Sequence, residues 1–293
     1  MKELQELARK LLTEGTVKVV LGWEEGRLGP RPVAITDPAE AGRLIFDTRC
    51  VHNLAAYLNP RRLHITRLGK AAVVVKGCDA RAVAGLIRET QVRREDVVLI
   101  GVRCGGVVRD PAGDGRLTVD TVADKCGSCP TRTPNLADHL VGELPPPPPV
   151  SLRRERRLDA LLAMPHKQRW DFWQTELSRC IRCHACREAC PLCFCARCVA
   201  DKSQPQWVET SAHPRGQLSW NFIRAIHLAG RCVDCGECER ACPSDIPLGL
   251  LNALLLRTAG QRYGHALNDD PAIPAPIGAF DKEQDPQDYM LYP

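Results

Sequence analysis

This sequence of 293 residues lacks the patterns typical of membrane proteins and of secreted proteins. No stretch approaches the roughly 18 consecutive apolar residues that a membrane-spanning helix requires, so we expect no membrane insertion. The opening MKELQELARKLL is an amphipathic helical pattern with mixed charges and contains no apolar signal core. We therefore expect a cytoplasmic protein in a reducing compartment, which argues against a disulfide framework.

A strong excess of charge and the familiar catalytic patterns are also lacking. A net charge of +5 is compatible with acidic partner proteins but too weak to indicate nucleic acid. Gly101, Gly105 and Gly106 do not follow the Gly-x-Gly-x-x-Gly order of a dinucleotide-binding loop. No Ser/His/Asp or Cys/His set stands out, so the sequence favours a non-catalytic role.

Five consecutive prolines, Pro145–Pro149, divide the chain almost in half. Such a run cannot continue a helix or a central strand and is typical of a stiff spacer. We predict a domain over residues 1–144, a linker over 145–150, a second domain over 151–267 and an extended tail over 268–293. The tail is rich in Pro and Asp and shows no period, which fits either disorder or extension along a partner.

The two halves carry different secondary-structure patterns. Ala71–Val75 and Val97–Val102 are short apolar runs typical of buried strands, and Ala80–Thr90 between them predicts a helix, so the two strands are expected to be parallel neighbours. The second half predicts helices, among them one from about Trp220 to Ala229. The fold class is therefore an α/β amino-terminal domain with a short parallel sheet, followed by a mostly α-helical domain.

Two groups of basic residues have ordinary interpretations. Arg153, Arg154, Arg156 and Arg157 favour a solvated linker helix over a phosphate-binding surface. Lys76, at the end of a predicted strand and two residues before Cys78, favours a position in water over a contact with a flavin phosphate or a role in tuning a cluster.

Sixteen cysteines are the unusual feature of the chain, and eight of them form two runs of Cys-x-x-Cys-x-x-Cys-x-x-x-Cys-Pro. The runs are Cys180, Cys183, Cys186, Cys190 and Cys232, Cys235, Cys238, Cys242. This is the bacterial ferredoxin spacing, in which the fourth cysteine ligates the other cluster. We therefore predict two 4Fe-4S clusters with crossed ligation: Cys180, Cys183 and Cys186 with Cys242, and Cys232, Cys235 and Cys238 with Cys190. The alternative is a pair of zinc sites, since thiolates also suit zinc.

The long connection between the two runs, together with NFIRAIHLAG, makes residues 170–255 resemble the helical ferredoxins of heterodisulfide reductase small subunits and succinate dehydrogenase iron–sulfur subunits. Arg182, His184 and Arg187 near the first run either raise the potential of its cluster or form a solvated helix face. Asp234, Glu237 and Glu239 flank the second run. If these charges lie close to their clusters, the first cluster is the easier to reduce.

Four further cysteines predict a third 4Fe-4S cluster. Cys78 and Cys104 each follow a predicted parallel strand, and the carboxyl ends of neighbouring parallel strands meet at one edge of a sheet. Cys126 and Cys129 add two more thiolates. The alternative is that Cys78 and Cys104 are small buried residues, which would leave the other pair without partners.

Gly77-Cys78, Cys104-Gly105 and Lys125-Cys126-x-x-Cys129 resemble the pattern of the coenzyme-dependent hydrogenase and formate dehydrogenase beta-subunit family. The resemblance implies one 4Fe-4S cluster held by these four cysteines; members place it beside a flavin, but this chain is shorter and the flavin region is not matched. Modules of both kinds, fused, resemble electron-transfer subunits that accompany heterodisulfide-reductase-like complexes in anaerobes. That resemblance implies electron flow between a dehydrogenase or hydrogenase partner and a flavoprotein.

Three functional hypotheses follow. The first is an electron-transfer subunit with three or four clusters. The second makes the amino-terminal half a flavin (FAD) domain that oxidises a soluble hydride carrier. The third is a zinc-bearing interaction scaffold.

Cys193, Cys195 and Cys198 directly follow the first run, and such dense thiols in a reducing cell favour a metal centre over inert thiols. We predict a fourth 4Fe-4S cluster or a zinc ion, with Cys50 or Asp201 as the further ligand. Cys50 has the alternative interpretation of a buried helix residue.

Overall fold

Two compact units make up the chain, and a computed structural model describes residues 1–60, 65, 68–209, 211–279 and 281–283. The first unit consists of residues 1–153, 191–194 and 268–271, and the second of residues 154–190, 195–267 and 272–293. The domain boundaries expected from the sequence stay predictions. The predicted tail lies in part outside the described residues; its described part includes the single turn η5 (Pro276–Gly278).

A five-stranded sheet forms the centre of the first unit, in the order β2-β1-β3-β4-β5. Its strands are β1 (Val19–Glu24), β2 (Arg31–Ile35), β3 (Ala71–Val75), β4 (Val97–Val102) and β5 (His139–Val141). Only β2 is antiparallel to its neighbour; β1, β3, β4 and β5 run parallel. The predicted strands and their parallel pairing are thus confirmed, and the first unit has the expected α/β character.

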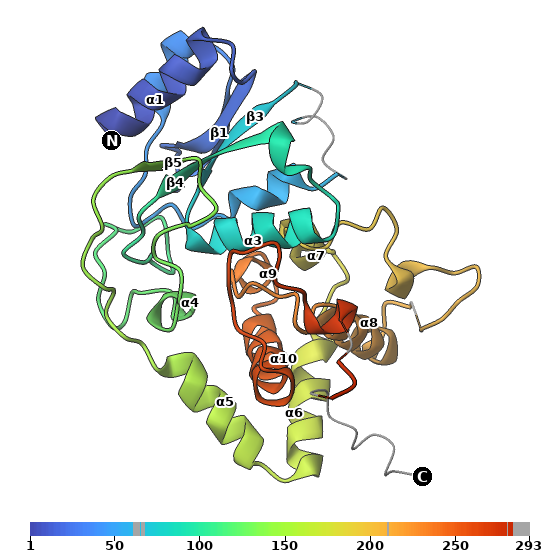
Figure 1. Ribbon diagram of the computed structural model, residues 1–293. Coiled ribbons are helices and arrows are strands. Elements are labelled where there is room, and N and C mark those ends of the chain that lie inside the picture. The colour runs from blue at the N-terminus through green and yellow to red at the C-terminus, as the bar shows by residue number, and fades with distance from the viewer. Residues whose placement is uncertain (61–64, 66–67, 210, 280, 284–293) are drawn as a thin grey trace. The chain divides into compact units, whose positions relative to one another are not determined.

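Burial explains why β3 and β4 are continuous apolar runs. Every residue of both strands is buried, as is usual for parallel strands covered on both faces. Helix α1 (Lys2–Thr13) packs against β1, and α3 (Gly77–Arg88) packs against β3 and β4 (Figure 1). Helix α3 begins at Gly77 rather than at the predicted Ala80, so Cys78 lies in its first turn. The unit also contains η1 (Pro38–Arg43), η2 (Leu54–Leu58), η3 (Arg94–Asp96) and α4 (Asp124–Gly127).

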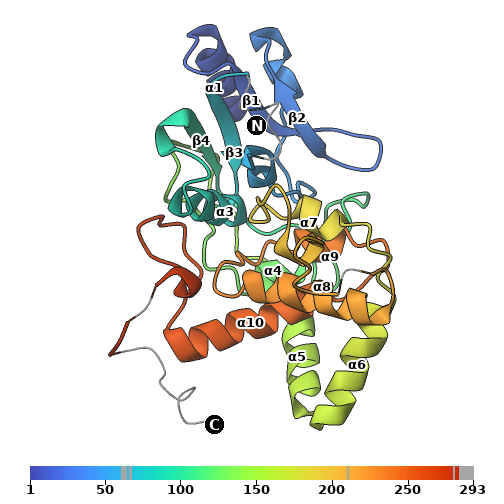
Figure 2. The same ribbon diagram turned by 90° about the vertical axis from the view of Figure 1, so that its right-hand side faces the viewer.

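The second unit is built from helices, as expected. They are α5 (Arg153–Ala163), α6 (His166–Ser178), α7 (Ala185–Ala189), η4 (Val199–Asp201), α8 (Pro214–His227), α9 (Glu237–Arg240) and α10 (Leu248–Tyr263). Helices α5 and α6 lie side by side as a hairpin in both views (Figures 1 and 2). Helix α8 packs against α6, and α7 packs against α9.

The core of the second unit places both cysteine runs against apolar side chains. Trp173 and Leu177 of α6 and Trp220 of α8 are buried in one cluster with Cys186 and Cys238. The short helices α7 and α9 each begin inside a cysteine run, so their contact brings the two runs together. Among the residues that the structure describes, no helix is both long enough and apolar enough to cross a membrane.

Candidate metal centres

Four thiols gather at the carboxyl edge of the sheet in the first unit. Cys78 follows β3 and Cys104 follows β4, and Val75 pairs with Gly101 at the ends of these strands. Besides burial, the proximity of Cys78 and Cys126 raises the pKa of Cys104, and the proximity of Cys129 raises that of Cys126. The structure therefore brings together the four cysteines that the sequence singled out.

A close backbone approach makes this gathering geometrically feasible. A Cβ at position 77 would lie 1.7 Å from the carbonyl oxygen of Thr131. Only glycine therefore allows the segment after Cys129 to lie against the start of α3. The absence of a side chain at Gly77 therefore lets the backbone beside Cys129 lie close to Cys78.

Donors point at three of these sulfurs. The backbone N–H of Gly106 donates to Cys104 Sγ over 3.4 Å, and that of Val107 donates to Cys126 Sγ over 3.3 Å. The guanidinium of Arg81, which is 2% exposed, donates to Cys129 Sγ over 3.3 Å. Hydrogen bonds from amides and cations stabilise thiolate sulfur, and they are one of the levers that set cluster potentials.

Burial disfavours the deprotonated form of the thiols at this edge of the sheet. Loss of water raises the pKa of Cys104 to about 12 and also raises the pKa of Cys78 and Cys126. Metal binding supplies the positive charge that permits deprotonation and releases the protons. The donor set of four thiols, two amides and a buried arginine fits an anionic iron–sulfur cluster.

In the second unit, one cavity is lined by cysteines from both ferredoxin runs. Cys180, Cys183 and Cys186 of the first run share it with Cys242, the last cysteine of the second run. Trp220 and Ile246 also line the cavity. This is the set that crossed ligation requires for the first cluster.

The second ferredoxin set consists of Cys232, Cys235 and Cys238 with Cys190, and its members lie near one another. Cys232 is within electrostatic range of Cys238 and of Cys190, the last cysteine of the first run, and Cys238 is within range of Cys190 as well. Cys235 is buried in the same run. Burial raises the pKa of Cys238 to about 11 and, in the other set, that of Cys186 to about 12.

The two runs bend their backbones in the same way. Arg182 and His184 have φ of 55° and 60°, and Asp234 and Gly236, at the matching positions of the second run, have φ of 54° and 71°. Left-handed conformations are uncommon for residues other than glycine. Their recurrence at matching positions shows that the spacing imposes one backbone path, which wraps each run around the space between its cysteines.

Acidic and basic side chains near the runs are paired with one another. Arg182 forms a 3.0 Å ion pair with Asp201, and its guanidinium lies 5.4 Å from the centre of the Trp220 ring. Asp234 is held by two bonds of 2.6 and 2.9 Å from Arg154. Glu237 pairs with an arginine one turn further along α9. These three charges therefore have partners of opposite sign, and the expected order of reduction stays a prediction.

The sequence did not predict the contacts of several residues near the cysteines. Arg154 was expected in water but binds Asp234, and Lys76 was expected in water but is 1% exposed. Arg224 of α8 is 4% exposed and donates to the carbonyl of Cys186 over 2.9 Å. Asn252 of α10 donates to Cys238 Sγ over 3.3 Å. A lone arginine within NFIRAIHLAG was the available signal for Arg224.

The three cysteines after the first run are divided between the units. Cys193 belongs to the first unit, and its carbonyl accepts a bond of 3.2 Å from the buried Asn59. Cys195 and Cys198 belong to the second unit, where the carbonyl of Cys195 accepts a bond of 2.8 Å from Arg187. The fourth metal centre therefore stays a prediction.

The two candidates for its further ligand have other contacts. Cys50 is fully buried in the first unit, where its sulfur accepts a bond of 3.4 Å from the backbone N–H of Asp47. It lies in an irregular segment before η2, so its interpretation as a helix residue is wrong. Burial raises the pKa of its thiol to about 12. Asp201 pairs with Arg182.

Within the described ranges, no three His, Cys, Asp or Glu side chains converge closely enough to hold a single metal ion. The thiols of the first ferredoxin set instead line a cavity.

Comparison with known proteins bears on both halves. Residues 176–246 match the family model described as a 4Fe-4S dicluster domain. Over 99 residues the chain is 34% identical to the succinate dehydrogenase iron-sulfur subunit of Bacillus subtilis, which covers 32% of this chain and 38% of that protein. The prediction of a ferredoxin segment with 4Fe-4S clusters is confirmed; the assignment of individual ligands stays a prediction.

Longer matches extend into the first unit. The chain is 23% identical to the F420-dependent formate dehydrogenase subunit beta of Methanocaldococcus jannaschii, over 70% of this chain and 75% of that protein. It is 22% identical to the F420-dependent formate dehydrogenase 1 subunit beta of Methanococcus maripaludis, over 71% and 76%. The predicted resemblance to such beta subunits is confirmed, and the chain is an iron–sulfur protein related to oxidoreductase subunits.

Proposed function

We propose that this chain is an electron-transfer subunit of a formate-dehydrogenase-type oxidoreductase complex and that it carries three 4Fe-4S clusters. The observation that supports this most is the grouping of twelve cysteines into three sets of four. The sets are Cys78, Cys104, Cys126 and Cys129; Cys180, Cys183, Cys186 and Cys242; and Cys232, Cys235, Cys238 and Cys190.

A 4Fe-4S cluster, when bound, takes up and returns one electron at a time. The residues of this chain supply thiolates, exclude water and stabilise negative charge. Gly106, Val107 and Arg81 donate to sulfurs of the first set, and Asn252 donates to a sulfur of the third. The described sites contain thiols and charge-balancing groups suited to electron transfer.

The proposed partners are a dehydrogenase or hydrogenase on one side and a heterodisulfide-reductase-like flavoprotein on the other. Support comes from the relatives, which are named as beta subunits of formate dehydrogenases. A subunit of this type has to exchange electrons with other chains of its complex.

Anaerobic isolation of the tagged chain from its native host tests this function. We expect a brown protein with broad thiolate-to-iron charge-transfer absorbance, accompanied by the chains of an oxidoreductase. A colourless protein with stoichiometric zinc would favour the interaction scaffold. An iron-loaded chain that no redox partner accompanies would contradict the role as a subunit.

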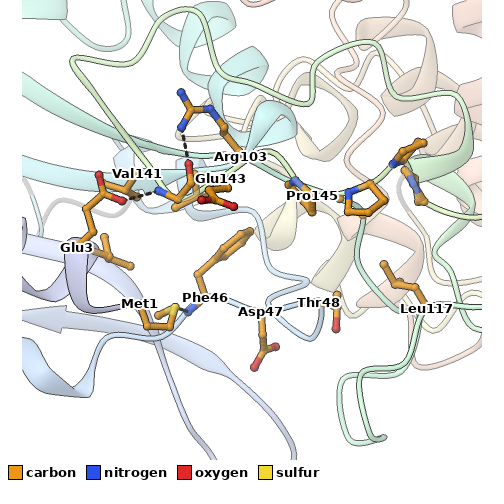
Figure 3. A pocket seen from close by; sticks show the side chains of 18 of the residues that line it. Met1, Glu3, Phe46, Asp47, Thr48, Arg103, Leu117, Val141, Glu143 and Pro145 are labelled. Atoms are coloured by element: carbon orange, nitrogen blue, oxygen red, sulfur yellow. Dashed lines mark hydrogen bonds between the residues drawn. The ribbon is translucent and has the colours of Figure 1, made fainter.

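A second candidate, a flavin-bearing subunit that oxidises a soluble hydride carrier, is favoured by a cavity in the first unit. The cavity measures about 610 Å³, within the range of cofactor pockets. It adjoins Gly105 and Gly106, which directly follow Cys104. Figure 3 shows the Phe46 ring pointing toward Glu143 and Pro145 at this cavity.

The walls of this cavity offer apolar surface to a planar ring. Prolines 145–149, Phe46 and Leu117 supply that surface, and Arg103 supplies one positive charge beside the acidic residues Glu3, Asp47 and Glu143. Arg103 donates to the carbonyl of Gly142, and Glu3 accepts from the N–H of Gly142 over 2.8 Å (Figure 3). Acid denaturation of the purified protein tests this candidate: release of FAD with its visible absorbance supports it, and a flavin-free supernatant rejects it.

A further inference from the structure

A fully buried lysine lies beside the thiols of the first unit. The Lys76 side chain is 1% exposed, and its Nζ donates to the carbonyl of His52 over 2.7 Å. The same nitrogen lies 3.0 Å from Asp79 Oδ2 and 4.2 Å from the centre of the buried Trp23 ring. The ammonium is therefore held at one place by an acid, a carbonyl and an aromatic face.

Such a pair is a poor source of stability. Taking two charges out of water costs several kcal/mol per ion, and well-packed apolar residues of similar volume stabilise a core as well or better. Asp79 is fully buried and also accepts from the backbone N–H groups of Leu54 and Lys76. The arrangement fixes the acid and, through it, the position of the lysine charge.

Asp79 connects the lysine to one of the proposed ligands, because its Oδ2 lies 3.0 Å from Lys76 Nζ and 3.9 Å from Cys78 Sγ. Burial raises the pKa of Cys104 and Cys126, and the charge of Lys76 acts against this rise at both thiols. At Cys78, where burial and then Asp79 raise the pKa, Lys125, Lys76 and Arg81 all act in the opposite direction. At Cys78, Lys76 is thus one of three cations that act against Asp79.

The contacts of Lys76 are those of an ammonium ion: its Nζ meets a carboxylate, a carbonyl oxygen and the face of an aromatic ring.

We propose that Lys76 is a charge-compensating residue that raises the reduction potential of the cluster bound by Cys78, Cys104, Cys126 and Cys129. This inference rests on the proposed function, because it requires that cluster. Lys76 stabilises the one additional negative charge that arrives with an electron from a reduced iron–sulfur or flavin donor. No proton is transferred, and no bond forms or breaks.

The charge pair itself supplies the test. Full-length, iron-loaded protein is titrated anaerobically with redox mediators, and each cluster is followed by its electron paramagnetic resonance signal. The variants are Lys76→Met, which removes the cation, and Asp79→Asn, which removes the anion. Lys76→Arg keeps the charge. Lys70→Met is the matched control, because this exposed lysine directly precedes the amino end of β3.

We expect opposite shifts in the two charge-removing variants. At the ambient potential where the wild-type amino-terminal cluster is half reduced, its ratio of reduced to oxidised form should fall at least about tenfold in Lys76→Met, which corresponds to about 59 mV for one electron. The ratio should rise in Asp79→Asn and stay within about twofold in Lys76→Arg and Lys70→Met. A residue that only supports folding would not produce shifts whose sign follows the charge removed.

Equal potentials in the variants and wild type would overturn the inference, as would shifts of the same sign in Lys76→Met and Asp79→Asn. If Lys76→Met binds no amino-terminal cluster, the Asp79→Asn variant alone tests the inference: a rise in the reduced-to-oxidised ratio supports it, and a fall or no change overturns it. Loss of that cluster from both variants would also overturn the inference, because the pair would then act on folding. Wild-type protein with about 8 iron atoms and no third signal would instead reject the third cluster itself.

Discussion

Arg154, near the start of α5, donates hydrogen bonds to both carboxylate oxygens of Asp234. Asp234 lies inside the second cysteine run and has a left-handed backbone conformation. The two side chains are 13% and 10% exposed. A two-point arginine–carboxylate pair fixes orientation as well as distance. The helical hairpin of the second unit therefore holds the cluster-binding turn between Cys232 and Cys235.

Replacing Arg154 with Met should weaken this turn. The substitution leaves a largely buried carboxylate without its partner, which costs about 3 kcal/mol. Arg156→Met on the same helix removes an exposed arginine and is the control. In urea, the visible iron–sulfur absorbance should be lost at a lower denaturant concentration in Arg154→Met than in Arg156→Met. Equal midpoints would show that the pair does not support the run.

Arg224 is expected to act on both ferredoxin sets at once. Its charge opposes the effect of burial on Cys186 in one set and on Cys238 in the other. Arg224→Gln should therefore make both clusters harder to reduce, by about tenfold in the reduced-to-oxidised ratio at a fixed potential. Arg215→Gln, an exposed residue of the same helix, is the control in the redox titration. A shift in only one cluster would contradict the shared role.

The sequence predicts the elements that bear the cysteines better than the residues that surround them. The strands ending before Lys76 and Cys104 are unbroken runs of small and β-branched apolar residues, and their spacing around a helix indicates parallel pairing. The ferredoxin spacing likewise predicts its metal chemistry, because it is specific to cluster-binding runs. These features are local and therefore visible in one sequence.

The surrounding contacts depend on tertiary structure. A lysine after a strand is ordinarily solvated, and Asp79 three residues later is a common helix-start residue, so nothing local indicates that Lys76 is buried against Trp23. Arg154 meets Asp234 across 80 positions of sequence. Gly236 signals its left-handed turn, whereas His184 at the equivalent bend does not.

Gly77→Ala should disrupt the amino-terminal site. The added Cβ would lie 1.7 Å from a backbone carbonyl, so the segment after Cys129 must move away. Overpacking of this kind costs about 1–3 kcal/mol, and here it also separates the ligands. Gly42→Ala in the same unit meets nothing within 4 Å and is the control. Iron analysis should show about four fewer atoms per chain for Gly77→Ala alone; full iron content would refute the argument.

Crossed ligation is tested by Cys242→Ser. Cys242 lines the cavity of Cys180, Cys183 and Cys186, so the signal of that cluster should be altered first. The matched variant Cys190→Ser should alter the other cluster. Electron paramagnetic resonance of the reduced proteins distinguishes the two signals. Damage confined to the cluster of each cysteine's own run would show that ligation is not crossed.

The number of clusters is the central claim, and iron and acid-labile sulfide per full-length chain measure it most directly. Mössbauer spectroscopy of the anaerobic protein should assign about 12 iron atoms to 4Fe-4S clusters, falling to about 8 in Cys104→Ser while both ferredoxin signals persist. Iron near 8 in the wild type, unchanged in Cys104→Ser, or stoichiometric zinc in place of iron, would contradict the account.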